Sequence, residues 1–178
     1  MAWFWRFLEW LRDLLGWRTS PPLPAPPPTL ACIDFSTMTP VPQGQPGTSP
    51  NPWLLPPPAG TVKFTTFNPA GSAAPGQAAN NRVWQQGAPA AAFTGLDCNF
   101  TLQVDLPTPA STVTLNLVHF SQPARIEGFD SSNTVVAAGS QAPPPRVAST
   151  VTLSGAGIEK VVVHSPADEV ILIEFCYG

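Results

Sequence analysis

The chain carries few charges for its length. Eight Lys and Arg and eleven Asp and Glu make up 11% of its 178 residues, whereas a soluble domain usually carries about 25%. Lys and Arg form no cluster, which argues against a nucleic-acid binder that relies on a basic surface. A highly charged disordered chain is excluded too, because 43% of the residues are hydrophobic and the net charge is only -3.

Long hydrophobic runs are absent as well. No run of 18 or more apolar residues occurs, so the sequence predicts no transmembrane helix. Charges at positions 6, 9, 12 and 13 interrupt the apolar start of the chain, and no A-x-A-like site precedes the prolines that follow. We therefore expect no cleavable signal peptide, and the first segment should remain in the mature protein.

Motifs that mark enzymes are missing. The sequence has no G-x-S-x-G motif, and its SGAG segment, 154–157, lies between two expected strands with no helix to bind a phosphate. Asp168 and Glu169 are adjacent and would point to opposite faces of a strand, which does not suit paired catalytic carboxylates. We predict a protein that is not an enzyme, with no catalytic residues, no cofactor and no metal site.

Cysteine is scarce. Cys32, Cys98 and Cys176 lie far apart and form no C-x-x-C pair, which speaks against a zinc or iron-sulfur site. One interpretation is that all three are small buried hydrophobic side chains. The other is a single disulfide, for which Cys32 and Cys176 are the preferred pair because they flank the globular part at its first and last strands. The cysteines thus leave the compartment open.

What the sequence does contain is an amphipathic segment at its start, residues 1–18. Placed on a helix at 100° per residue, its apolar side chains fill one half of the circumference and its charged side chains the other. Some 16 helical residues span roughly 24 Å, which is too short to cross a membrane. The apolar half consists of Trp3, Phe4, Phe7, Leu8, Trp10, Leu11, Leu14, Leu15 and Trp17.

An isolated helix of this length is marginal in water, so its apolar half needs a partner. A membrane surface is one, because Trp favours the headgroup boundary. Other subunits are another, since Trp3, Trp10 and Trp17 recur every seven residues. In the third alternative the helix folds back onto its own domain. We expect a peripheral membrane protein or part of a larger assembly, with a homo-oligomer as the expected state.

Proline is abundant, with 24 residues, and more than half of them fall between positions 19 and 60. The segment 19–30 includes SPPLPAPPP and predicts a semi-rigid polyproline II spacer. A long proline-rich loop is expected at about 38–60. Between these two segments, ACIDF reads as the first strand of a domain that spans 31–178.

The remainder of the chain predicts an all-β domain. Short alternating or β-branched runs recur between Gly, Pro, Asn and Ser turns, and no helical period appears among them. This pattern is typical of an antiparallel β-sandwich, preceded here by one amphipathic α-helix and a Pro-rich linker. The expected strands are 31–35, 61–67, 82–86, 99–106, 111–120, 124–130, 134–138, 149–154, 159–165 and 169–177.

Four segments of this domain carry a family resemblance: TVTLNLVHF, ARIEGFDSSNTVVAAGS, STVTLSGAGIEKVVVHS and EVILIEFCYG. Their succession resembles the later strands of bacterial galactose-binding-like, or discoidin-like, jelly-roll domains. The resemblance covers about 31–178. It implies a jelly-roll β-sandwich that binds carbohydrate or another surface ligand, without catalysis, through loops at one end. Some members hold calcium in an early loop, but the acids here are scattered, so calcium is not carried over.

The best candidate for ligand binding is NNRVWQQ. Trp84 offers a flat ring for a sugar, and Arg82 and Gln86 offer hydrogen bonds beside it. A Trp in the core or at an interface is the alternative. The leading hypothesis is a non-enzymatic recognition or adhesion module, anchored by residues 1–18 to a membrane surface or larger assembly, with carbohydrate as a candidate ligand. Its rival is a structural subunit that self-assembles through the helix and the weakly charged sandwich surface.

Overall fold

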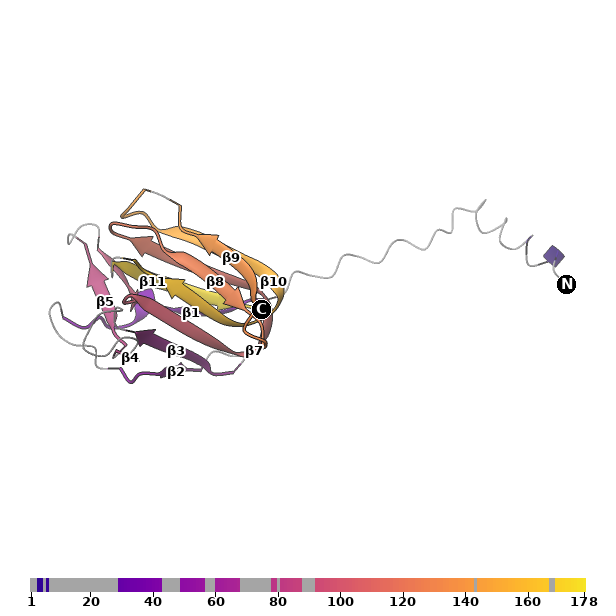
Figure 1. Ribbon diagram of the computed structural model, residues 1–178, viewed down its shortest axis with the longest axis horizontal. Coiled ribbons are helices and arrows are strands. Elements are labelled where there is room, and N and C mark those ends of the chain that lie inside the picture. The colour runs from indigo at the N-terminus through magenta and orange to yellow at the C-terminus, as the bar shows by residue number, and fades with distance from the viewer. Residues whose placement is uncertain are drawn as a thin grey trace.

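Figure 1 shows the computed structural model of the chain, whose described part is mainly a β domain. The domain is antiparallel, as the sequence predicts, and within the described residues of the domain the one helical element is a short 3-10 turn. The structure describes residues 3, 4, 6, 29–42, 49–56, 60–67, 78, 79, 81–87, 92–142, 144–166 and 169–178.

The strands follow the expected β-branched runs, with three additions. β2, β4 and β6 were not predicted, and β2 interrupts the proline-rich region expected as a long loop. The elements are β1 (Ala31–Asp34), η1 (Phe35–Thr37), β2 (Trp53–Leu55), β3 (Val62–Phe67), β4 (Ala78–Ala79), β5 (Val83–Gln86), β6 (Phe93–Asp97), β7 (Thr101–His119), β8 (Arg125–Phe129), β9 (Val135–Ser140), β10 (Ser149–His164) and β11 (Val170–Tyr177).

Two strands are longer than the sequence predicts. The runs 99–106 and 111–120 were expected as separate strands, as were 149–154 and 159–165, but they belong to β7 and β10. These two strands pair antiparallel from Thr101 opposite His164 to Leu117 opposite Ser149, with register shifts midway. The shifts fall at LPTP and GAG, whose Pro and Gly read as turns although strand pairing continues past them.

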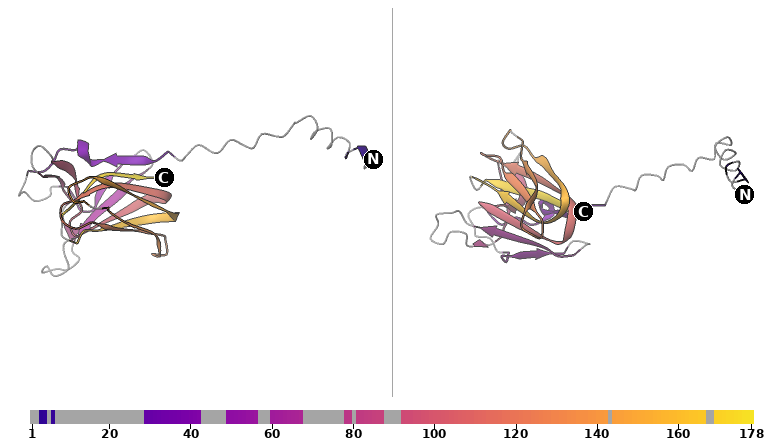
Figure 2. Two further views of the ribbon diagram at one scale, coloured as in Figure 1. Left: turned by 90° about the horizontal axis from the view of Figure 1, so that it is seen from above. Right: turned by 45° about the vertical axis from the view of Figure 1, so that its right-hand side comes forward.

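The long β7–β10 ribbon folds over at these shifts and contributes to two layers. In the first layer, the first half of β7 lies between β3 and the second half of β10. The other edge of this half of β10 pairs with β8, and β8 pairs in turn with β9. In the second layer, the second half of β7 lies between β11 and the first half of β10. The other edge of β11 pairs with β1 and β6. Figures 1 and 2 show the two layers face to face.

The core lies between the layers because each strand alternates inward apolar and outward polar residues. Phe64 of β3 is fully buried, with its ring centroid 5.8 Å from that of Phe175 of β11. Phe35 of η1 adds a third ring, 5.3 Å from Phe64. His119 continues the inward face of β7 and is 1% exposed. These contacts join the two layers and η1 into one core.

The domain has two unlike ends. At the linker end, Leu30 lies beside Gly178, and the backbone N–H groups of Ser111 and Thr112 donate to the Gly178 carbonyl at 2.9 Å. At the loop end lie β5 and the residues that border 43–48, 68–77 and 88–91, where the Val41 N–H donates to Val83 O at 2.8 Å. Figure 1 shows β5 and the C-terminus at opposite ends of the domain. The chain thus enters and leaves the domain at the linker end.

Candidate functional site

The residues predicted to bind a ligand lie on or beside β5, at the loop end. Alternation puts Arg82, Trp84 and Gln86 on one side of the strand, whereas Val83 points into the core and is 4% exposed. Trp84 stands opposite Gly95 of β6. A Cβ at Gly95 would lie 2.4 Å from the Ile171 side chain, so β6 passes too close to β11 for a larger residue. The backbone across from Trp84 is therefore tightly packed.

Arg82 is held by two internal contacts. Its Cζ lies 4.0 Å from the centroid of the Trp84 ring, and its Nε donates a hydrogen bond to the carboxylate of Asp97. Asp97 is 3% exposed and also accepts the backbone N–H of Asn99 at 3.0 Å. Because a buried carboxylate requires a charged or hydrogen-bonding partner, this pair fixes Arg82 over the Trp84 ring. Asp97 was missed from sequence, since only the β5–β6 register brings it to Arg82.

The Trp84 cluster, defined as Arg82, Trp84, Gln86 and Asp97, thus combines a partly exposed ring with a polar surround. Trp84 and Gln86 keep part of their surface in solvent. The Nε1 atom of Trp84 is buried and has no hydrogen-bond partner in the described part of the chain. Because the Arg82 guanidinium lies over the Trp84 ring, the rest of the ring surface and the Gln86 amide are what remain for a ligand such as a sugar ring.

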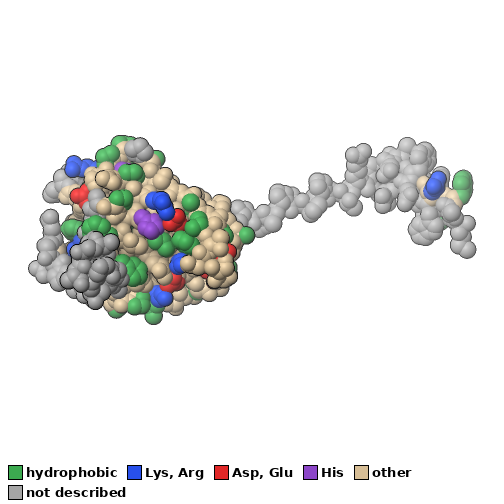
Figure 3. All heavy atoms as spheres, viewed as in Figure 1, with side chains coloured by type: hydrophobic (Ala, Val, Ile, Leu, Met, Phe, Trp, Pro, Cys, Tyr) green, Lys and Arg blue, Asp and Glu red, His purple; other side chains and the backbone are tan. Residues whose placement is uncertain are grey.

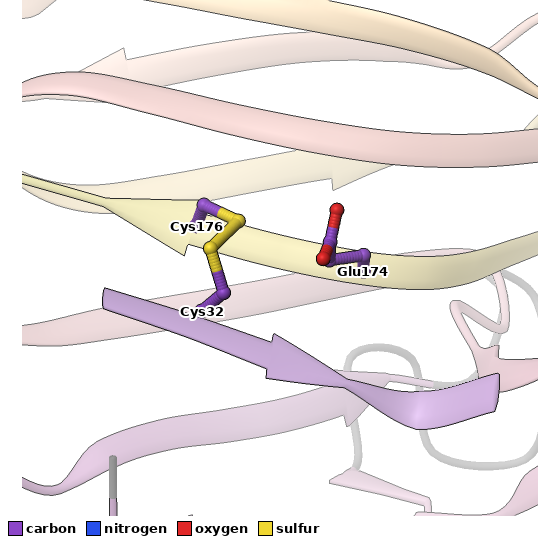
Figure 4. A group of neighbouring side chains, drawn as sticks. All are labelled: Cys32, Glu174 and Cys176. Carbon is purple, nitrogen blue, oxygen red and sulfur yellow. A yellow bond between two sulfur atoms is a disulfide. The ribbon is translucent and has the colours of Figure 1, made fainter. Parts of the chain in front are cut away.

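Cys32 and Cys176 form a disulfide between β1 and β11, the pair that the sequence argument preferred. They stand directly opposite each other in the strand register, with Cα atoms 4.1 Å apart. The carboxylate of Glu174 lies beside them, and Figure 4 shows the three side chains on neighbouring strands. Cys98, which takes no part in the disulfide, is buried in the core. The disulfide therefore links the first strand of the domain to the last.

The outer face of the first layer carries three of the four ion pairs found among the described residues. Lys63 Nζ lies 2.6 Å from Asp105 Oδ2, and Arg125 Nη2 lies 2.6 Å from Glu127 Oε1. His164 Nε2 is 3.1 Å from the other oxygen of Glu127. Figure 3 shows charged and His side chains gathered on the face turned to the viewer. We call this the charged face: Lys63, Gln103, Asp105, Arg125, Glu127, Lys160 and His164.

The outer face of the second layer is built from short neutral side chains. On this face the polar positions of β7 pair directly with those of β10, while Val113, Leu115 and Val151 point inward. Beside it, β11 places Glu174 next to Asn116 and Cys176 next to Thr114. We call it the hydroxyl face: Thr112, Thr114, Asn116, Thr150, Thr152 and Ser154.

The apolar half of residues 1–18 falls mostly outside the described residues. Trp3, Phe4 and Arg6 are described and are helical, and Trp3 and Phe4 are 80% and 58% exposed. The predicted amphipathic helix as a whole, with its contacts, thus stays a prediction. In the described part of the chain no helix has the length and apolar character needed to cross a membrane.

Comparisons with known proteins add no relative. No protein-family model matches the chain, and a search of curated proteins finds no similar sequence. Function must therefore be argued from the geometry of this domain.

Proposed function

We propose that this protein is a non-enzymatic recognition or adhesion module, displayed from its N-terminal helix. The observation that carries this proposal is the separation of the two ends of the domain. The chain enters at Leu30 beside Gly178, whereas the Trp84 cluster lies at the loop end. A domain tethered at the linker end would present the loop end to a ligand.

The finer fold assignment, a jelly-roll β-sandwich, is part of the same proposal. It is supported by the β7–β10 ribbon, which remains paired while it contributes to both layers. A long antiparallel ribbon wrapped over two layers is the architecture of jelly rolls. The resemblance of the later strands to discoidin-like domains favours the same assignment, and with it ligand binding by one end of the sandwich.

Carbohydrate is the ligand class that the Trp84 cluster favours. Sugars have apolar ring faces that stack on aromatic side chains and hydroxyls that bond to amides and guanidinium groups. The Asp97 carboxylate holds Arg82 over one side of the ring, so a sugar would contact the remaining exposed surface of Trp84 and the amide of Gln86. The polar partners would thus be in place before the ligand binds.

A glycan array probed with the 178-residue chain tests this proposal. We expect a defined subset of glycans to bind, and Trp84→Ala to weaken that binding about tenfold or more because the stacking contact is lost. Leu54→Ala is the matched control, since Leu54 is an exposed apolar residue on β2. Near-ultraviolet circular dichroism shows whether Trp84→Ala keeps the fold. If a folded Trp84→Ala chain binds as the parent does, or if no glycan binds, the carbohydrate assignment is wrong.

Residues 1–18 are proposed as the anchor of this module. Trp3 and Phe4 are apolar, exposed and separated from the domain by the Pro-rich spacer 19–30. A membrane surface fits this segment because Trp side chains favour the boundary between headgroups and hydrocarbon. We place the protein at a membrane surface or within a larger assembly as a peripheral component.

The rival proposal, a self-assembling structural subunit, is favoured by a different observation. Val135 of the edge strand β9 is 46% exposed, and the hydroxyl face carries no charge that would oppose contact with a second copy. Sedimentation of the 178-residue chain in the absence of lipid distinguishes the two proposals. A homo-oligomer that a Val135→Lys variant dissociates would favour a structural subunit that assembles through the β9 edge. A monomer would exclude assembly through that edge and through the hydroxyl face.

A further inference from the structure

The disulfide lies beside a carboxylate, that of Glu174, whose position the sequence does not predict. Cys32 of β1 is exposed, and Cys176 and Glu174 of β11 share its side of the sheet. One ligand atom from each of the three residues lies within 4.8 Å of the others. Figure 4 shows Cys32 on one strand, and Glu174 and Cys176 on the strand next to it. Two sulfur atoms and a carboxylate are therefore gathered at one place, where Cys32 is exposed, Glu174 is half-buried and Cys176 is buried.

A bulge in β11 is what puts Glu174 there. Leu172 stands opposite Leu117 and Glu174 opposite Asn116, so Ile173 is an extra residue in the pairing. Strict alternation from the buried Leu172 would have turned Glu174 toward the core. The extra residue reverses the phase, so Phe175 points inward while Glu174 and Cys176 share the outer side with Cys32.

Once the disulfide is reduced, this arrangement offers the ligand types and spacing that a thiophilic divalent cation prefers. Tetrahedral zinc binds thiolate at about 2.3 Å and carboxylate at about 2.0–2.2 Å, which puts two ligating sulfur atoms about 3.8 Å apart. Directly opposed cysteines with Cα atoms 4.1 Å apart allow that spacing. The Glu174 carboxylate is close enough to become the third ligand by side-chain rotation, and water would complete the coordination.

The charges around the cluster favour a cation as well. Asp34 stands directly opposite Glu174 on the same side of the β1–β11 pair. Neither strand contains a Lys or Arg, and the neighbouring positions on β7, Thr114 and Asn116, are neutral. Two carboxylates with no cationic partner on these strands attract a divalent ion and would stabilise it next to two thiolates.

We propose that the reduced protein binds one thiophilic divalent cation, zinc by its chemistry, through Cys32, Cys176 and Glu174. A reducing thiol attacks the exposed Cys32 sulfur and the S–S bond breaks, so that Cys176 leaves as a thiolate. A second thiol releases Cys32 from the mixed disulfide. The two reducing thiols are oxidised to a disulfide, and the protein gains two electrons and two protons. Metal binding then releases the two thiol protons, and the ion replaces the disulfide as the link between β1 and β11.

Cobalt titration of the reduced 178-residue chain tests this site. A phosphine reductant converts the disulfide to two thiols while the phosphine takes the oxygen of one water molecule, and it is then removed without air. We expect one cobalt ion per chain, with the near-ultraviolet absorption of sulfur-to-cobalt charge transfer, and displacement of cobalt by zinc. The oxidised chain should show no such absorption.

Three variants assign the ligands. Cys32→Ser should abolish the charge-transfer absorption, and Glu174→Gln should weaken binding about tenfold or more while the absorption band remains. Cys98→Ser is the matched control and should bind as the parent does, because that thiol is buried in the core. Equal binding by Cys32→Ser, or unchanged affinity in Glu174→Gln, would overturn the proposal. So would a reduced chain that is unfolded by far-ultraviolet circular dichroism and does not regain its fold when zinc is added.

Discussion

The two outer faces of the domain are built on the same two strands yet differ in chemistry. The charged face uses the first half of β7 and the second half of β10, and its charged side chains other than Lys160 pair with one another. The hydroxyl face uses the other halves of these strands and bears Thr, Ser and Asn. Next to it, the strands are joined by the disulfide between Cys32 and Cys176.

This difference explains where the few charges of the chain go. Exposed ion pairs contribute little to stability because water and salt screen them. A covalent link between the first and last strands contributes much more, since it restricts the unfolded chain. We infer that the domain depends on its core and on the β1–β11 link, and that the charged face serves mainly solubility.

The disulfide should give the largest effect. Replacing both Cys32 and Cys176 by Ala opens a loop that spans 144 positions of sequence separation. We expect the free energy of unfolding, measured by urea denaturation, to fall by about 2–5 kcal/mol. Cys98→Ala removes a buried thiol but no cross-link, and a cost of about 1 kcal/mol is expected. If the Cys32→Ala, Cys176→Ala variant is no less stable than Cys98→Ala, the β1–β11 link does not contribute more to stability than the ion pairs of the charged face.

Glu127→Gln should have a smaller effect on the charged face. Glu127 forms an ion pair with Arg125 and contacts His164, so the substitution removes the ion pair and weakens the His164 contact in a partly exposed network. The expected loss is about 1 kcal/mol or less, and it should shrink further in 1 M salt because screening has already weakened the pair. Urea denaturation at low and high salt measures it. A loss above about 3 kcal/mol would mean that this network is a buried structural pair.

The β8–β9 turn provides a pH-dependent contribution. Asp130 Oδ1 accepts hydrogen bonds from the Ser132 hydroxyl at 2.7 Å and the Thr134 N–H at 2.9 Å. These bonds, led by that of Ser132, hold the pKa of Asp130 below its usual value. The carboxylate therefore stabilises the fold at neutral pH, and this contribution is lost as the pH falls through the lowered pKa.

Asp130→Asn tests that contribution. The variant should be less stable than the parent at pH 7, and the two should converge at acidic pH, where Asp130 is protonated. Thermal unfolding across pH 2–7 follows the difference. A difference that stays constant over this range would show that the charge of Asp130 contributes nothing.

The smallest effect is expected on the hydroxyl face. Thr152→Val keeps the shape and β-branching of an exposed side chain on β10. In the isolated protein the change in unfolding free energy should stay within about 0.5 kcal/mol. A larger loss, seen in urea denaturation, would mean that the Thr152 hydroxyl is part of a structural network. The two faces would then differ less in their contribution to stability than in their composition.

Much of the fold follows from the sequence because alternation and turn residues are local signals. Val113, Leu115 and Leu117 alternate with polar residues, and all three are buried. The continuity of β7 through LPTP could not be predicted, since proline normally ends strand pairing and the register shifts that accommodate it depend on the partner strand β10. The bulge at Ile173 could not be predicted from the sequence either, because a residue is extra only relative to its partner strand, here β7.

The candidate site shows the same limit. Sequence reasoning identified Trp84, Arg82 and Gln86 as residues of one strand face, since this needs only the two-residue period. It did not find Asp97, which reaches Arg82 through the pairing of β5 with β6. Nor did it find Glu174 beside the disulfide. Contacts between residues far apart in sequence require the register of the strands, which alternation alone does not fix.

Liposome flotation tests most directly the central claim, that residues 1–18 attach the linker end of the domain to a membrane surface. The 178-residue chain should float with phosphatidylcholine vesicles, and so should Glu9→Gln, a control on the charged half of the helix. A chain that begins at Leu30, and the variant with Leu8→Asp and Leu15→Asp on the apolar half, should remain in the dense fraction. Equal flotation with and without residues 1–29, or no flotation of the 178-residue chain, would contradict the claim.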